Sequence, residues 1–187
     1  MRDKATIKGK VTATVFDEYG NIKRRALNWW RKFFNYFLGI LYLPLLQGRL
    51  LVIVNHNIVT NHGDALIADA MSNTQARTAV DNTSGVIGVG TGFSAATKTV
   101  TALVTQTGSN EAMDATYPKL KGAFNATDDN VTQYRSTFEA GDLNTTGIDE
   151  VALGNGTDLL AYAALTSFDI TASDTLQIDW ELTFVGS

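Results

Sequence analysis

The sequence predicts a mainly β protein, an antiparallel β-sandwich of jelly-roll type with one short helix, an N-terminal hairpin and an apolar arm. Apolar and polar residues alternate in several segments, and Gly, Asn and Asp recur between them, as in proteins built of short strands and tight turns. We expect about seven or eight strands. The 187 residues are 44% hydrophobic and 18% charged, which allows a packed core, and the lack of cysteine excludes disulfides and thiolate metal sites.

The first expected element is a strand over residues 5–16, because apolar and polar side chains alternate there. One face carries Ile7, Val11, Ala13 and Val15, and the other carries Lys8, Lys10, Thr12 and Thr14. Residues 17–21 form a turn in which Gly20 can take positive φ. "IKRR" at 22–25 then begins a return strand, which predicts a hairpin with a basic face.

The next segment, residues 29–54, is unlike the rest of the chain because it is apolar and aromatic. Read as a helix, it places six large side chains on one broad face: Trp30, Phe33, Phe34, Phe37, Leu38 and Leu41. Pro44 marks the expected end of this helix, and "RLLVIVNHN" at 49–57 is expected to be a strand.

A short helix is expected at residues 60–73, where Asn61 or Asp64 can cap the N-terminus and apolar residues recur at helical spacing. The remaining elements are expected to be strands: 85–92; 98–107, as a strand or an irregular crossing; a hairpin of 119–127 and 131–140; and two strands within 148–166.

The clearest strand is predicted at residues 175–184, "TLQIDWELTF". Its apolar face is formed by Leu176, Ile178, Trp180, Leu182 and Phe184, and its polar face by Gln177, Asp179, Glu181 and Thr183. Unbroken alternation of this kind predicts a well-paired strand with Trp180 in the core.

The sequence shows no motif for catalysis, a cofactor or a metal in a plausible setting. "GVGTG" at 88–92 lacks the last Gly of a dinucleotide fingerprint and the Lys of a phosphate loop, so it predicts a tight turn after a strand. His56, His62 and Asp64 could hold a metal, but ordinary turn residues are the preferred interpretation. Asp128, Asp129 and Asn130 lack the spacing of a calcium loop and predict a hairpin turn. We therefore expect no enzyme, no cofactor and no metal.

Charge divides the chain into a basic N-terminal part and an acidic remainder. Residues 1–56 carry ten Lys/Arg against three Asp/Glu, whereas residues 57–187 carry five against sixteen. This favours an arm that meets an anionic surface, or copies that meet head to tail. Residues 22–34 combine basic and aromatic side chains, yet the acidic remainder disfavours a specific nucleic-acid partner.

Several short motifs, taken in order, give the chain a resemblance to small structural proteins of tailed-phage virions. They are "KGKVTATVFDEYGNI", "TNHGDALIADAM", "IGVGTG", "YRSTFEAGDLNTTGIDEVALGN" and "TLQIDWELTF". The resemblance implies an architectural role in a virion assembled in the host cytoplasm, as a capsid decoration or minor capsid protein or as a tail or neck component. It implies no catalytic residues. The apolar segment 29–54 departs from this pattern.

The expected organisation is an N-terminal hairpin and arm over 1–54 and a sandwich body over 55–187, together one structural domain. We expect the arm to contact other virion proteins and copies of this chain. Its hypothetical interface residues are Arg24, Arg25, Trp29, Trp30, Arg31, Phe33, Phe34, Phe37, Leu38 and Leu41. Two alternatives stay open: a virion protein anchored in a membrane through residues 29–48, and a carbohydrate-binding sandwich with Trp180 and Tyr residues as sugar platforms.

Overall fold

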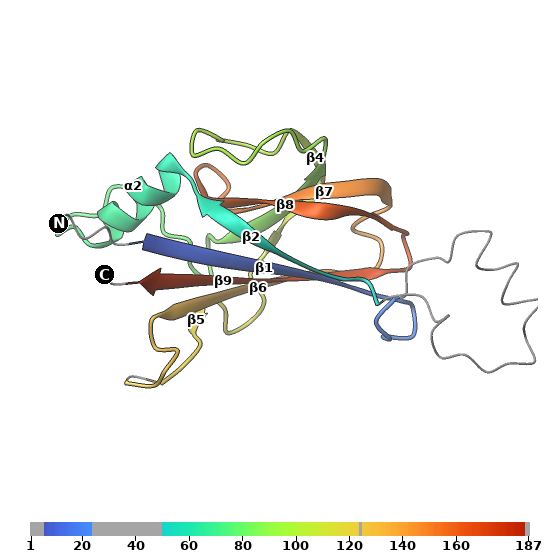
Figure 1. Ribbon diagram of the computed structural model, residues 1–187, viewed down its shortest axis with the longest axis horizontal. Helices are drawn as coiled ribbons and strands as arrows, with labels where there is room; N and C mark the ends of the chain where they lie inside the picture. Colours follow the sequence, from blue (N-terminus) through green and yellow to red (C-terminus); the bar gives the residue numbers. More distant parts are fainter. Residues whose placement is uncertain (1–5, 24–49, 124, 186–187) are drawn as a thin grey trace, which may run out of the picture.

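The computed structural model describes residues 6–23, 50–123 and 125–185. These form nine strands and one helix, and the strands make one antiparallel sheet in the order β4-β3-β7-β8-β2-β1-β9-β6-β5 (Figure 1). The strands are β1 (Thr6–Phe16), β2 (Val52–Val59), β3 (Val86–Thr91), β4 (Thr105–Ala112), β5 (Lys119–Leu120), β6 (Val131–Phe138), β7 (Thr145–Gly154), β8 (Leu159–Ile170) and β9 (Thr175–Val185), and the helix is α2 (Asn61–Ala70).

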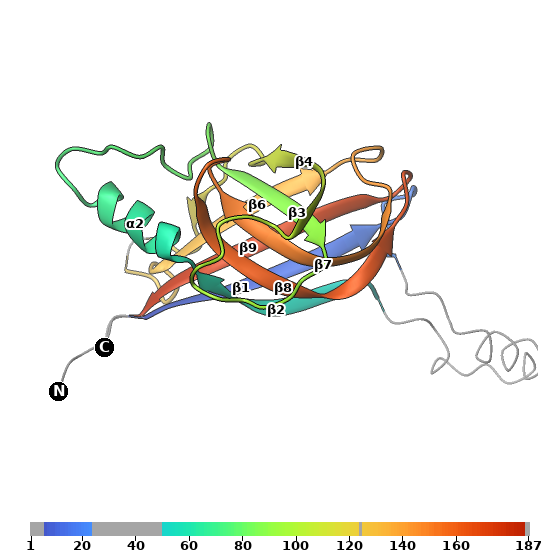
Figure 2. The same ribbon diagram turned by 90° about the horizontal axis from the view of Figure 1, so that it is seen from above.

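The sheet curls strongly into a half-barrel, so the expected two-sheet sandwich is wrong (Figure 2). β2 joins the two halves, since it pairs with β1 up to Asn57 and with β8 through Ile58 and Val59. The curl also brings the chain after β4 against β6, where Asp114 N donates to Arg135 O at 2.8 Å. Alternation of side chains shows that each strand has one buried face, but it does not show whether those faces belong to two sheets or to one curled sheet.

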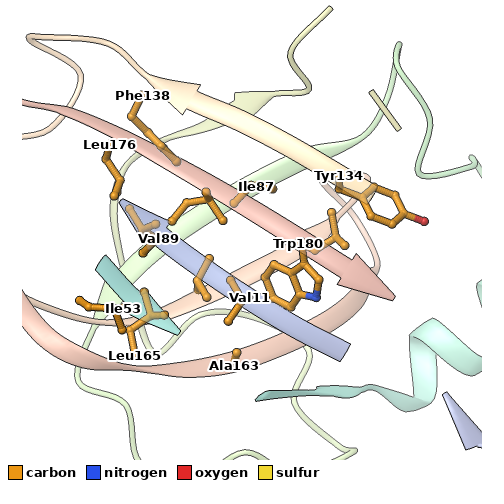
Figure 3. Packing of buried hydrophobic residues seen from close by; sticks show 14 of the residues in the cluster. Val11, Ile53, Ile87, Val89, Tyr134, Phe138, Ala163, Leu165, Leu176 and Trp180 are labelled. Atoms are coloured by element: carbon orange, nitrogen blue, oxygen red, sulfur yellow. The ribbon is translucent and has the colours of Figure 1, made fainter. Parts of the chain in front are cut away.

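A single hydrophobic core fills the inside of the curled sheet. Side chains from β1, β2, β3, β6, β8 and β9 meet there, with the ring of Trp180 among them (Figure 3). Fully buried residues include Val11, Ile87, Leu153, Ile178 and Trp180. One continuous core of this kind predicts a cooperative fold.

The two clearest sequence predictions are confirmed at β1 and β9. Val11, Ala13 and Val15 of β1 and Leu176, Ile178, Trp180 and Leu182 of β9 are all 0% exposed. Phe184 is the exception on its face, because it lies at the end of β9 and is 39% exposed. β1 lies between β2 and β9, so residues 6–16 belong to the middle of the sheet.

The turn after β1 is confirmed, with Gly20 at φ 76°. The expected return strand is reduced, within the described residues, to an isolated bridge between Ile22 and Phe16 and a hydrogen bond from Lys23 N to Val15 O. Arg24 and Arg25 lie outside the described residues. The strands that pair with β1 over most of its length are β2 and β9, and the side chains of all three contribute to the core.

The remaining elements follow the sequence closely: the choice left open at 98–107 is resolved, and three other predictions need correction. Residues 98–104 cross irregularly and β4 begins only at Thr105, whereas β5 is two residues long. The strand expected at 49–57 begins and ends later, as β2. The N-cap of α2 is Thr60 rather than Asn61 or Asp64, because Thr60 has extended φ/ψ and its hydroxyl accepts from Gly63 N at 2.9 Å.

Candidate interaction site

The two ends of the curled sheet differ in what they offer to other molecules. α2 lies at one end, and the turn after β1 lies at the other (Figures 1 and 2). At the second end, Leu51 N donates to Lys23 O at 2.7 Å, and Val15 N donates to Leu51 O at 3.2 Å. Lys23 and Leu51, on either side of residues 24–50, therefore lie side by side. We call Val15, Lys23, Leu51 and Asp174 the arm base.

An ion pair between the partly exposed Lys23 and the buried Asp174 ties the arm base to the turn between β8 and β9. The Lys23 ammonium donates to Asp174, whose side chain is only 3% exposed. Asp174 also accepts from the backbone N–H and the hydroxyl of Thr171, both at 2.7 Å. Burial raises the pKa of Asp174, but the hydrogen bonds from Lys23 and Thr171 outweigh it and hold this pKa below its usual value. The arm base therefore stabilises the charged form of Asp174.

All ten hypothetical interface residues of the arm lie outside the described residues: Arg24, Arg25, Trp29, Trp30, Arg31, Phe33, Phe34, Phe37, Leu38 and Leu41. The same holds for residues 29–48, on which the membrane alternative depends. Across the part of the chain that the structure describes, no helix is long and apolar enough to cross a bilayer.

An exposed apolar stripe runs from the arm base along the outer face of β2. Leu50, Val52 and Val54 are 46%, 39% and 55% exposed, while Leu51 and Ile53 between them are buried. The sequence prediction of a strand did not identify this stripe. The continuous apolar run "LLVIV" could have indicated it, because a strand with one solvated face should alternate apolar and polar residues.

At the opposite end, an apolar groove of about 340 Å³ lies between α2, the chain that follows it, and the ends of three strands. We call it the α2 groove. Its lining comes from α2, from residues 71–80, and from β6, β8 and β9 through Tyr134, Leu160 and Phe184. Met71 is 79% exposed beside it. The sequence predicted α2 itself, but the groove depends on which strands end near the helix.

Hydrogen bonds to two aspartates hold the wall of the α2 groove. The Asp69 carboxylate accepts from Ala76 N at 3.0 Å and Arg77 N at 2.8 Å, and these bonds lower the pKa of Asp69. Arg77 donates to Asp158 at 2.9 Å, and His62 Nδ1 lies 2.9 Å from the same carboxylate. Asp69 and Asp158 thus fix residues 71–80 against α2 and the turn between β7 and β8.

The residues weighed as metal ligands do not come together. His56 lies on the outer face of β2 opposite Lys10, His62 contacts Asp158, and Asp64 pairs with Lys98. Among the described residues no group of three side chains is arranged to hold a metal ion. At the candidate calcium residues 128–130, Asp129 accepts from Asn125 N within its own loop, and Asn130 donates to Phe184 O of β9.

Trp180 is 0% exposed, so its ring is not available as a sugar platform. This removes Trp180 from the carbohydrate alternative, which also named the Tyr residues. A buried tryptophan of this kind contributes to the core instead.

A buried carboxylate that sequence reasoning missed fastens the irregular crossing before β4. Glu150 is 0% exposed and accepts from Val104 N and Thr105 N, each at 3.0 Å, and from the Tyr162 hydroxyl. Burial and the hydrogen bond to Glu150 raise the pKa of Tyr162. A Cβ on Gly90 would lie only 2.6 Å from Glu150 Oε1, so the glycine at this position leaves room for the Glu150 side chain. Gly92, at φ 88°, supplies the turn predicted there. Because both oxygens have backbone donors, Glu150 has a structural role.

Comparison with protein-family models, with curated proteins and with solved structures gives no match for this chain. Function is therefore inferred from the two ends of the sheet, the charge of the chain and the sequence resemblance described above.

Proposed function

We propose that this protein is a non-enzymatic structural component of a phage particle, where it assembles through contacts with other virion proteins and with copies of itself. The observation that carries this proposal is the arm base. Hydrogen bonds between Val15, Lys23 and Leu51 make residues 24–50 an insertion whose two ends are fixed to one point of a folded sheet. An apolar, aromatic insertion on a rigid support is suited to contact with a partner surface.

The core of the described chain supports this role, because it is already filled by strand residues. Its members come from β1, β2, β3, β6, β7, β8 and β9, from Leu66 of α2, and from the connecting residues Leu51, Met113, Tyr117 and Leu143. The aromatic side chains of the arm are then surplus to the core. A soluble monomer rarely exposes apolar patches beyond a few hundred Å², so these side chains require a partner.

A protein partner fits the arm better than lipid does. The uncharged run from Phe33 to Gly48 is 16 residues long, whereas a spanning helix needs about 20. Pro44 and Arg49 add further cost. Aromatic residues and Arg are enriched at the centres of protein interfaces. The pair Trp29 and Trp30 beside Arg31 and Lys32 is the observation that favours the membrane alternative.

The test replaces residues 28–48 with a short Gly/Ser linker, which the closed arm base can accommodate. A second variant keeps the length of the segment but replaces its aromatic residues with Ser, so that loss of length and loss of side chains are separated. We expect both variants to fold and to lose incorporation into particles. Full incorporation of both variants would contradict the proposal.

The same variants test the membrane alternative by flotation with liposomes. We expect intact protein to stay with the soluble fraction. If intact protein floats and the shortened variant does not, lipid replaces protein as the partner of the arm.

A further inference from the structure

We infer that the α2 groove binds the aromatic arm residues 29–41 of a second copy of this chain, so that copies join head to tail. The inference rests on the proposed function and adds a named partner surface to it. Four observations support it: the shape and apolar lining of the groove, its position, its charge, and the composition of the arm.

The α2 groove suits apolar side chains. Its volume of about 340 Å³ lies within the range of about 300–1,000 Å³ usual for pockets that enclose a ligand. Leu66, Ile67 and Leu160 supply aliphatic lining, and Tyr134 and Phe184 supply aromatic lining. Met71, at the end of α2, adds an adaptable side chain to the rim.

The position of the groove favours a second copy over the arm of the same copy. Phe184 pairs with Ile7, whereas Lys23 binds Val15, eight residues further along β1. At about 3.3 Å per residue this separation is about 26 Å. Trp29 follows Lys23 by six residues, so even an extended chain carries it only about 21 Å. Phe33 and the residues after it could span the separation within one copy, so it is the segment 29–41 as a whole, with Trp29 and Trp30, that requires a second copy. The Trp29 of a neighbouring copy has no such limit.

Charge also favours this pairing. Residues 24–49 carry five Lys/Arg and no Asp/Glu, while residues 50–185 carry five against sixteen. α2 ends at the groove with no basic residue in its last turn, so the negative end of its dipole is not neutralised by its own side chains. Asp69 adds a carboxylate there, and the nearby Arg77 is already paired with Asp158. Arg31 and Lys32 of the arm complement this rim.

An arm at one end and a groove at the other make a heterologous contact, in which each copy donates at one end and accepts at the other. Such contacts form rings where the rotation closes and open chains where it does not. A copy that lacks only its arm and a copy that lacks only a functional groove should therefore join once and stop.

The experiment measures molar mass by light scattering during size-exclusion chromatography, over a range of protein and salt concentrations. The arm-deleted variant carries the linker in place of residues 28–48. The groove variants are Ala70→Lys on α2 and Ala79→Lys on the facing wall, which place a cation on the apolar lining. Ala68→Lys is the matched control, because Ala68 is an exposed residue of the same helix outside the lining.

We expect intact protein and Ala68→Lys to form assemblies that weaken as salt increases, and the arm-deleted and groove variants each to be monomeric. A mixture of arm-deleted and groove variants should give 1:1 dimers and nothing larger. Circular dichroism and thermal unfolding check that each variant is folded.

Other outcomes would overturn the inference. If both folded groove variants assemble as intact protein does, the groove is not the partner of the arm. If the arm-deleted variant is nevertheless monomeric or absent from particles, arm-mediated assembly survives and only the groove assignment is wrong. Intact protein that stays monomeric at every concentration also overturns the inference, because copies then do not bind one another; incorporation into particles tests the proposed function separately.

Discussion

The arm base and the α2 groove lie on one sheet and share one core, but they are built differently. The arm base is closed by backbone hydrogen bonds and by an ion pair between Lys23 and the buried carboxylate of Asp174. At the other end, α2 is attached to the sheet through its cap residue Thr60, whose hydroxyl donates to Leu159 O, and leaves an apolar space beside it. The first end fixes Lys23 and Leu51 beside each other, and the second leaves an apolar surface uncovered among the described residues.

The two ends therefore differ in kind: polar groups with hydrogen-bond partners fix the arm base, whereas the α2 groove exposes apolar surface. Buried polar groups with complete partners specify one arrangement of the backbone. An apolar groove constrains the orientation of its contacts much less, because the hydrophobic effect is non-directional. The arm base is therefore suited to support an arm, and the α2 groove is suited to receive a side chain. Five predictions test this division, from the largest expected effect to the smallest.

Trp180→Ala should destabilise both ends together, because the tryptophan belongs to the core that they share. We expect a loss of about 3–5 kcal/mol in the free energy of unfolding, measured by urea denaturation. Hydrogen exchange should show reduced protection at both the arm base and α2. Thr183→Ala, on the other face of the same strand, should cost less than about 1 kcal/mol. A loss below about 1 kcal/mol for Trp180→Ala would contradict the assigned face of β9.

Asp174→Asn should lower the free energy of unfolding, measured by urea denaturation, by about 1.5–3 kcal/mol. This is the usual range for hydrogen bonds to charged groups. The matched control at the other end is Asp64→Asn, which breaks an ion pair whose two side chains, Asp64 and Lys98, are half exposed. That substitution should cost less than about 1 kcal/mol. Equal losses in the two variants would remove the distinction between the ends.

Acid should also act on the arm base through Asp174. Its folded pKa is lower than its unfolded pKa, so its charge stabilises the fold fully above the unfolded pKa of about 3.9. That contribution is lost as the pH falls through the lower folded pKa. The difference in stability between intact protein and Asp174→Asn should therefore shrink on acidification below about pH 4. A difference that stays constant would show that the charge of Asp174 does not stabilise the fold.

Thr60→Ala should loosen α2 with a smaller effect on the arm base. Loss of the cap should cost about 1–2 kcal/mol, and hydrogen exchange should increase mainly in α2. Thr60→Ser keeps the hydroxyl and should recover most of the loss. An equal increase of exchange at Lys23 and Leu51 would show that the two ends do not respond separately.

Ala70→Lys should have the smallest effect on stability, within about 0.5 kcal/mol, because Ala70 is exposed. Chemical denaturation of this variant beside Ala68→Lys measures it. A large loss in Ala70→Lys alone would mean that the groove is part of the fold itself and not a surface left free for contact.

Much of the local structure followed from the sequence alone. Period-two alternation placed Val11, Ile178 and Trp180 in the core, since the two faces of a strand are fixed by the backbone itself. Gly20 and Gly92 marked turns because glycine takes positive φ without a steric cost. The spacing of apolar residues also located α2. Its cap was misassigned because Asn61, Asp64 and Thr60 are all suitable cap residues, and only the backbone conformation distinguishes them.

The tertiary structure decided how these elements combine. β2 pairs with both β1 and β8 and so makes one curled sheet where alternation allowed two, because strand partners are chosen by contacts between distant residues. Glu150 became a buried structural group only because the crossing before β4 brings Val104 N and Thr105 N to its carboxylate. The α2 groove and the closed arm base likewise depend on residues far apart in the chain, such as Leu66 with Phe184 and Lys23 with Asp174. A local pattern fixes which face of an element is apolar, but only the fold brings two such faces together or leaves one uncovered.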